Sequence, residues 1–169
     1  MKYSRFEELP VWKHAIELAR RMYAFIAIDP FRLHPGLRDQ LERATLSISN
    51  NVAEGFERGS TNELLAFLYI ARGSAGEVRS MLSVLEDWSA FGNFKSQISD
   101  LKIESENISK QLYKWIESLK SSDIRGQRHL DDKTRMRLEA RKERESFLEE
   151  LRHLNEIAAE RRHVQHSET

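Results

Sequence analysis

The feature that most constrains this fold is a run of apolar residues between positions 64 and 85, spaced alternately by four and three positions. An α-helix turns once every 3.6 residues, so residues at this spacing share one face of a helix. The run consists of Leu64, Leu68, Ala71, Ala75, Val78, Leu82 and Leu85. It predicts a long helix that packs along its whole length against other helices, as in a coiled coil.

Three further stretches show the same spacing. The first, residues 10–28, carries Trp12, Ile16, Ala19, Tyr23 and Ile26. The second, residues 35–55, carries Leu37, Leu41, Ala44, Ile48 and Val52. The last, residues 94–119, carries Phe94, Ile98, Leu101, Ser105, Ile108, Leu112, Trp115 and Leu119. Each stretch is predicted to form an amphipathic helix whose stripe faces a common core.

Short breaks separate these four helices. Pro30 ends the first, because the residue before a proline is pushed out of the α conformation. Gly55 marks a stop or a close contact in the second, and Ser60 or Thr61 can cap the third with help from Glu63. Helices joined by such short connections must reverse direction each time. We therefore expect an all-α fold, an antiparallel up-down four-helix bundle over residues 1–121.

The remaining residues, 122–169, have a different character. Residues 122–132 mix Gly126 with charges, and residues 133–163 are dense in Arg and Glu. Apolar residues keep helical spacing only at Phe147, Leu151, Leu154 and Ala158. This pattern predicts a charged linker and a C-terminal helical arm, either solvated or forming half of a coiled coil, rather than a second domain.

Composition narrows the class of protein. The chain has no cysteine, so disulfides, thiolate nucleophiles and cysteine-based metal sites are excluded. Charges interrupt the first eight residues, and no later apolar run is long enough to span a membrane. We expect a cytoplasmic protein. The 27 Lys plus Arg balance the 27 Asp plus Glu, so any binding of nucleic acid must use a local patch.

Four sequence blocks occur in order along the predicted bundle. They are Phe6-x-x-Leu9-x-Val11-Trp12-Lys13-x-Ala15, Leu37-x-x-Gln40-Leu41-x-Arg43-Ala44, Ser47-Ile48-x-Asn50-Asn51-Val52-Ala53-Glu54-Gly55-Phe56-x-Arg58 and Phe67-Leu68-x-Ile70-Ala71-Arg72-Gly73-Ser74-x-x-Glu77. From about Tyr3 to Leu119 the chain thereby resembles the four-helix-bundle proteins encoded in intervening sequences of bacterial 23S rRNA genes. That family includes the accessory variability determinants of diversity-generating retroelements.

The resemblance carries expectations about assembly and partners. It implies a homopentamer of four-helix bundles, nucleic-acid binding for some members, and a reverse transcriptase as the partner of the retroelement branch. It implies no enzymatic activity and no cofactor.

Basic residues on the predicted helices are candidates for nucleic-acid contact. Tyr69, Arg72 and Arg79 share one helix face, with Gly76 between the two arginines, so a phosphate could reach both guanidinium groups. The other candidates are Lys13, Arg20, Arg43 and Arg58. For each residue taken singly, a solvated surface role is the competing interpretation.

Oligomerisation is predicted from two sets of residues. Apolar residues off the main stripes would be exposed in a monomer; they are Leu18, Phe25, Leu65 and Ile70. A polar stripe and three residues of the third helix are candidates for the interface: Gln40, Ser47, Asn50, Glu54, Gly73, Ser74 and Glu77. For Gly73 and Ser74 we expect close approach of a neighbouring helix.

No catalytic motif is present, so we expect no enzyme. Two Glu-x-x-His pairs, Glu150 with His153 and Glu160 with His163, have the spacing of di-iron bundles, but both lie in the charged arm and we expect no metal site. Two functions stay open: a homo-oligomeric protein that binds RNA or DNA, and a structural or protein-interaction module without nucleic acid.

Overall fold

The computed structural model describes residues 3–121, 140 and 143–150. Within residues 3–121 four long helices form, α1 (Pro10–Ile26), α2 (Pro35–Glu57), α3 (Thr61–Glu86) and α4 (Lys95–Lys120). Short 3-10 segments precede three of them, η1 (Phe6–Glu8), η2 (Asp29–Leu33) and η3 (Ser89–Phe94). The described residues contain no strand, and the predicted all-α class is confirmed.

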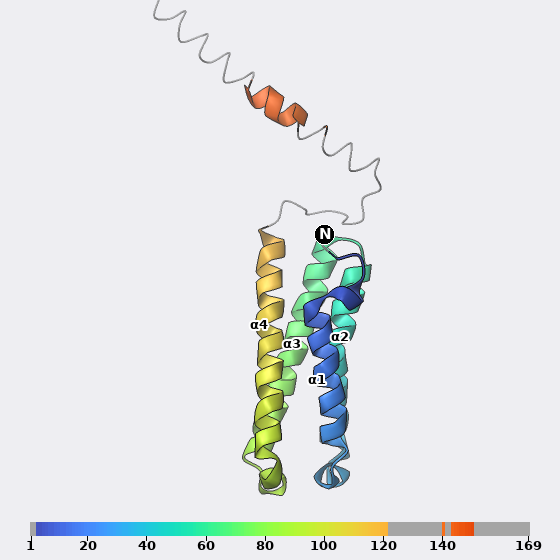
Figure 1. Ribbon diagram of the computed structural model, residues 1–169, viewed down its shortest axis with the longest axis vertical. Helices are drawn as coiled ribbons and strands as arrows, with labels where there is room; N and C mark the ends of the chain where they lie inside the picture. The colour runs from blue at the N-terminus through green and yellow to red at the C-terminus, as the bar shows by residue number, and fades with distance from the viewer. Residues whose placement is uncertain (1–2, 122–139, 141–142, 151–169) are drawn as a thin grey trace, which may run out of the picture. The chain divides into compact units, whose positions relative to one another are not determined.

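Each helix packs against its neighbours in sequence, and α1 also packs against α4, so α1 and α3 occupy diagonal positions (Figure 1). Side-chain contacts show how the helices run. His14 meets Gln111 whereas Arg21 meets Glu104, so α1 and α4 run in opposite directions. The connections lie at alternating ends of the bundle (Figure 1).

The stripe of α3 is the centre of the core. All seven of its predicted members are fully buried, as are Leu41, Ile48 and Val52 of α2. From α4, the stripe residues from Ile98 to Leu112 are buried, and Trp115 and Leu119 pack on the edge of the core. Burial of this many apolar side chains, each contributing roughly 1.5–3 kcal/mol, is what holds the four helices together.

The predicted inward face of α1 is wrong by about one residue. The helix buries Val11, Ala15, Leu18, Met22 and Phe25. Of the predicted stripe only Ala19 and Ile26 are buried, whereas Trp12 and Ile16 are half-buried and Tyr23 is 40% exposed. The helix carries two adjacent apolar stripes with the same spacing, and periodicity alone cannot choose between them.

This shift also corrects two of the residues that we expected to be exposed in a monomer. Leu18 and Phe25 are fully buried within the single chain, so neither requires a partner subunit. Leu65 is half-buried against the core, and Ile70 alone of the four is exposed, at 51%.

The helix ends follow local chemistry. Ser60 caps α3, because its hydroxyl oxygen accepts the backbone N–H of Glu63 at 3.3 Å and its hydroxyl donates to the Glu63 carboxylate at 2.5 Å. α1 ends at Ile26, two residues before the predicted end, and the chain continues into η2. Gly55 does not stop α2, which runs on to Glu57.

Gly55 is instead a point of close helix contact, the second of the two predicted roles. It is buried, and a methyl group at this position would lie 2.7 Å from Cβ of Phe67 on α3. Glycine is required here because any larger residue would push the two helices apart.

Aromatic rings close the end of the bundle where η2 and η3 lie. Phe25 and Phe31 pack edge to face with centroids 5.2 Å apart, and Phe31 and Phe91 do so at 4.9 Å. The two 3-10 segments thus each contribute a fully buried phenylalanine, which fixes the connections to the core.

The chain divides into two units, Met1–Arg128 and His129–Thr169. In the second unit, residues 143–150 are helical, with Phe147 and Leu148 exposed. Most residues of the predicted arm stripe and of the Glu-x-x-His pairs lie outside the described residues, namely Leu151, His153, Leu154, Ala158, Glu160 and His163. The helical arm stripe and the expectation that these pairs bind no metal therefore stay predictions. Among the helices that are described, none is long and apolar enough to cross a membrane.

Candidate nucleic-acid interface

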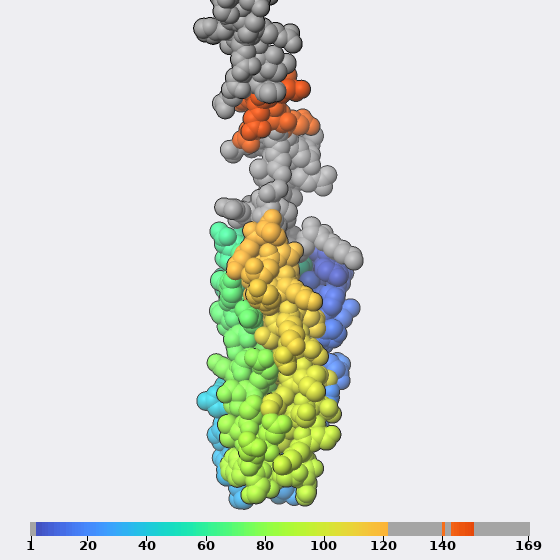
Figure 2. Space-filling model, turned by 90° about the vertical axis from the view of Figure 1, so that its left-hand side faces the viewer, coloured from blue at the N-terminus to red at the C-terminus, as the bar shows by residue number. Residues whose placement is uncertain are grey.

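The candidate site is the outer junction of α3 and α4, which we call the α3–α4 seam. These two helices lie side by side on the face shown in Figure 2. Side chains meet across the seam at Glu86 with Lys102, Arg72 with Tyr113, and Tyr69 with Lys120. Since residue numbers fall on α3 as they rise on α4, the two helices are antiparallel and the seam runs along most of their length.

Arg72 lies at the middle of the seam and is held by an aromatic ring. Its guanidinium carbon is 4.9 Å from the ring centroid of Tyr113. Within residues 3–121 it forms no ion pair, whereas Arg5, Arg20 and Arg58 each pair with a glutamate. A stacked guanidinium keeps its edge donors free, so Arg72 is positioned to bind a phosphate.

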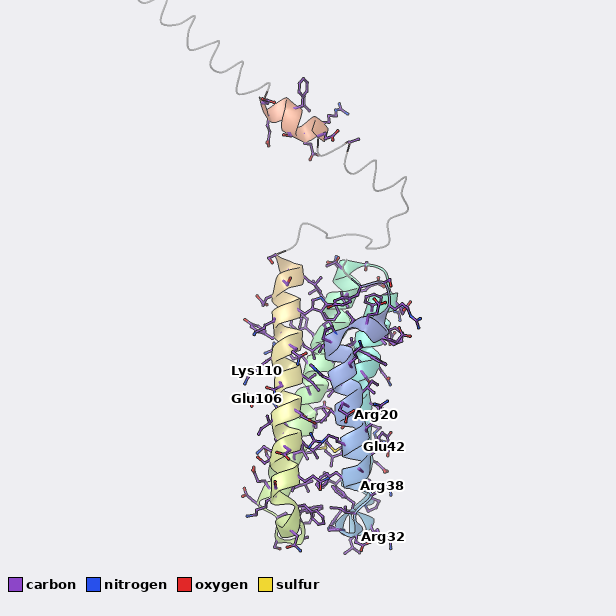
Figure 3. The ribbon with its side chains drawn as sticks, in the orientation of Figure 1. Arg20, Arg32, Arg38, Glu42, Glu106 and Lys110 are labelled. Carbon is purple, nitrogen blue, oxygen red and sulfur yellow. The ribbon has the colours of Figure 1, made fainter. Side chains whose placement is uncertain are left out.

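Arg79 lies two turns further along α3 and is half-buried. Its Nε is buried and has no hydrogen-bond partner among the described residues. The charge of Arg79 acts on the carboxylate of Glu106, but that carboxylate forms its ion pair with Lys110, at 2.6 Å. The hydrogen bond and charge of Lys110, and then the charge of Arg79, lower the pKa of Glu106. Figure 3 shows Glu106 and Lys110 side by side on α4.

Tyr69 and Lys120 form the end of the seam. The Lys120 ammonium lies 5.5 Å from the Tyr69 ring centroid. A hydrogen bond with Tyr69 and then one with Glu117 raise the pKa of Lys120, so this side chain stays charged. Tyr69 is 44% exposed and Tyr113 is 48% exposed.

An open groove of about 460 Å³ continues the seam beyond Arg79. Small residues create it: α3 contributes Gly76 and Ser83, and α4 contributes Ser99. Lys102 also lines the groove and is paired with Glu86 across it. The groove therefore holds as many carboxylates as cations, and its charge is balanced.

The structure does not bring all seven predicted contact residues together. Tyr69, Arg72 and Arg79 share the seam. Lys13 and Arg20 are exposed on α1, diagonal to α3, and Arg20 is bound to Glu17 at 3.5 Å (Figure 3). Arg43 is exposed on α2. Arg58, at the end of α2, pairs with Glu54 at 2.6 Å and lies over the Phe67 ring.

The predicted interface residues divide into two groups. Ser47 of α2 and Ser74 of α3 form a 2.8 Å hydrogen bond. We call the junction of these two helices, which also contains the contact of Gly55 with Phe67, the α2–α3 seam. Close helix approach at Ser74 is thus confirmed within one chain. The remaining residues are exposed, namely Gln40, Asn50, Glu54, Gly73 and Glu77.

No helix packs closely on Gly73 among the described residues, so the close approach expected there is not made within the chain, and the place of Gly73 in an interface between subunits stays a prediction. A methyl group at Gly73 or at Gly76 would meet nothing within 4 Å. Both residues lie in the interior of α3, where glycine costs about 1 kcal/mol relative to alanine. No contact inside residues 3–121 accounts for that cost.

Sequence reasoning missed three residues of the seam: Tyr113, Lys102 and Lys120. All three are on α4 and lie outside its apolar stripe. Only the register of α4 against α3 shows that they lie beside the arginines of α3. Residues 87–94 form a short connection between two antiparallel helices. Counting back from that connection along each helix places a residue near 113 opposite Arg72. That register was the signal that could have identified them.

The fold and this seam define a helical-bundle protein with exposed tyrosines and arginines beside a charge-balanced groove. A sequence model of the family described as 23S rRNA-intervening sequence protein matches residues 7–114. The chain belongs to this family, as its four sequence blocks predicted. The match spans α1, α2 and α3 and most of α4. No curated protein matches the chain.

Proposed function

We propose that this protein acts by binding, as a homo-oligomer that holds RNA or DNA along the α3–α4 seam and catalyses no reaction. The observation that carries the proposal is the pair of arginines, Arg72 and Arg79, on one face of α3 with neither forming an ion pair among the described residues. They are seven positions apart in the helix, roughly 10 Å along the axis. Gly76 leaves the surface between them low, so a sugar-phosphate backbone has access to both.

Phosphate is the ligand that fits this arrangement. A guanidinium group binds phosphate oxygens through two parallel N–H donors. Nε of Arg79 is buried and has no hydrogen-bond partner among the described residues, so a phosphate would have to bind the terminal N–H groups of this side chain. Zero net charge and the nearby Glu77, Glu86 and Glu106 mean that attraction acts only at short range.

Self-association is the second part of the proposal. The outer face of α3 exposes Ile70 and Val84, and α4 exposes Ile103. These apolar residues, together with the resemblance to homopentameric proteins, support an oligomer that covers part of this face. Light scattering at micromolar concentration should give a mass that is a multiple of 19.8 kDa. A single species of 19.8 kDa would contradict self-association.

A second candidate function is a protein-interaction module that binds no nucleic acid. The observation that favours it is the pair Gly73 and Gly76, whose open surroundings would let a partner helix approach α3 closely. For the retroelement branch of the family, the resemblance implies a reverse transcriptase as that partner. One stoichiometric protein partner that stays bound after nuclease treatment would support this candidate.

The experiment that separates the two candidates measures binding of RNA and of DNA to the full chain at about 50 mM salt and at increasing salt. Displacement of counterions makes the logarithm of a phosphate-dependent affinity fall linearly with the logarithm of salt. We expect measurable binding that weakens in this way. No binding at about 50 mM salt, or binding that does not respond to salt, would contradict the proposal.

A further inference from the structure

Two tyrosine rings lie open on the α3–α4 seam, and the phosphate-binding proposal does not use them. Tyr69 of α3 and Tyr113 of α4 are each nearly half exposed. Neither belongs to the apolar stripe of its helix, so neither is required for the core. Their exposed ring surface is the feature from which a ligand class can be inferred.

Each ring is contacted by a cation from the facing helix. Arg72 of α3 lies over Tyr113 of α4, and Lys120 of α4 lies over Tyr69 of α3. This reciprocal arrangement restricts the motion of both rings and places a cation beside each, Lys120 being also paired with Glu117 at 2.9 Å. Rings that are already ordered lose little entropy when a further flat group stacks on them.

The groups alternate along the seam. The seam begins at Arg79, which has no ion pair among the described residues, continues with Arg72 and Tyr113, and ends with Tyr69 and Lys120. Arg79 and Tyr69 are ten positions apart on α3, about 15 Å along the helix axis. Cations next to exposed aromatic rings are the elements that bind single strands, because phosphates pair with the cations and unpaired bases stack on the rings. A duplex keeps its bases stacked internally and would use the cations alone.

We propose that the seam from Arg79 to Lys120 binds single-stranded RNA or DNA, with bases stacked on Tyr69 and Tyr113 and phosphates bound by Arg72 and Arg79. This inference rests on the proposed function and narrows it to one class of nucleic acid. It assigns Tyr69 and Tyr113 as residues that distinguish a single strand from a duplex.

The test compares a short single strand with the same strand annealed to its complement, for RNA and for DNA, using the full chain. Three variants are measured: Tyr69→Leu/Tyr113→Leu, Tyr69→Phe/Tyr113→Phe, and Tyr23→Leu as a matched control. Tyr23 is likewise exposed, at 40%, but lies on α1, diagonal to α3. Circular dichroism confirms that each variant is helical.

We expect the native chain to prefer the single strand. Leucine at both positions should weaken single-strand binding by about tenfold or more for each lost stack and leave duplex binding unchanged. The phenylalanine variant, which keeps both rings, and the Tyr23→Leu variant should bind like the native chain. A strand carrying 2-aminopurine should lose fluorescence on binding to the native chain through stacking.

The contradicting results separate the two proposals. If the chain binds neither form of nucleic acid, the proposed function fails and this inference with it. If it binds a duplex as tightly as a single strand, or if leucine at both positions changes nothing, base stacking is wrong while the proposed function stands. Should the leucine variant not fold, unquenched 2-aminopurine with the native chain would by itself overturn the inference.

Discussion

The two sides of α3 use glycine in opposite ways. In the α2–α3 seam, Gly55 is buried and its Cα is so close to Phe67 that no methyl group fits. In the α3–α4 seam, Gly76 borders an open groove and a methyl group there would contact nothing. Ser47 and Ser74 form a hydrogen bond with each other in the first seam, whereas Nε of Arg79 has no partner among the described residues in the second.

This difference indicates that one seam serves folding and the other is available for a ligand. Polar groups and small residues in the α2–α3 seam are accounted for by contacts within the chain. The α3–α4 seam retains exposed tyrosine rings, two arginines without an ion pair among the described residues, and Gly76, which destabilises the helix. Features that cost stability without an internal contact are expected at functional surfaces.

The largest effect on stability is expected from a larger side chain in the α2–α3 seam. Gly55→Val should destabilise the fold by about 3 kcal/mol, because the added atoms overlap Phe67 and Leu64 and the helices must separate. Gly76→Val is the matched control and should change stability by less than about 0.5 kcal/mol. Denaturant unfolding at one protein concentration measures both, and equal losses would show that the seams do not differ.

Replacing the exposed glycines of α3 by alanine should change stability in the opposite direction. Gly73→Ala and Gly76→Ala should each stabilise the fold by about 1 kcal/mol, since alanine restricts the unfolded chain and has space in the helix. Thermal unfolding monitored by circular dichroism tests this. Lower stability, together with a smaller mass by light scattering, would mean that a second copy of the chain packs closely on these glycines.

A smaller difference is expected between serines of the two seams. Ser47→Ala removes hydrogen bonds to Ser74 and Asn51 and should destabilise the fold by about 1 kcal/mol. Ser83→Ala removes only a bond to the carbonyl of Arg79 in its own helix, near the surface, and should be neutral within about 0.5 kcal/mol. The midpoints of denaturant unfolding, compared between variants that unfold with equal slope, measure both losses. A larger loss of stability at Ser83 than at Ser47 would contradict this expectation.

The smallest change in stability is expected from the ion pair across the groove. Glu86→Gln leaves Lys102 unpaired, but both side chains are partly exposed and the loss should be below about 1 kcal/mol. Nucleic-acid affinity should rise, because a repulsive carboxylate is removed and a cation is freed. An unchanged affinity in filter binding would place the groove outside the binding surface.

The sequence predicted the buried core better than the exposed α3–α4 seam. The α3 stripe was correct throughout because it is apolar at every position, whereas polar residues at Ser74 and Glu77 interrupt the competing face of that helix. The face of α1 was wrong because Val11 and Trp12 each begin an apolar stripe. Register between helices depends on side-chain packing, so Tyr113, opposite Arg72, could not be identified from periodicity.

The same limit explains the scattered candidates. Lys13, Arg20 and Arg43 were grouped with the α3 arginines by residue type, but the order of helices around the bundle separates them. Gly73 was assigned to packing because small residues usually serve it. Only the space around a Cβ placed on Gly73 shows that none of the described helices comes close to it.

If phosphate binds at Arg72 and Arg79, replacing both arginines must change the salt dependence of nucleic-acid binding. Arg72→Gln/Arg79→Gln should keep a near-native melting temperature, bind more weakly, and lower the slope of log affinity against log salt by about two, or somewhat less on single strands. Lys13→Gln/Arg20→Gln removes the same charge at the same seven-residue spacing on α1 and should leave the slope unchanged. If instead the α3 variant keeps the native affinity and slope, or the α1 variant loses as much, the α3–α4 seam is not the phosphate-binding surface.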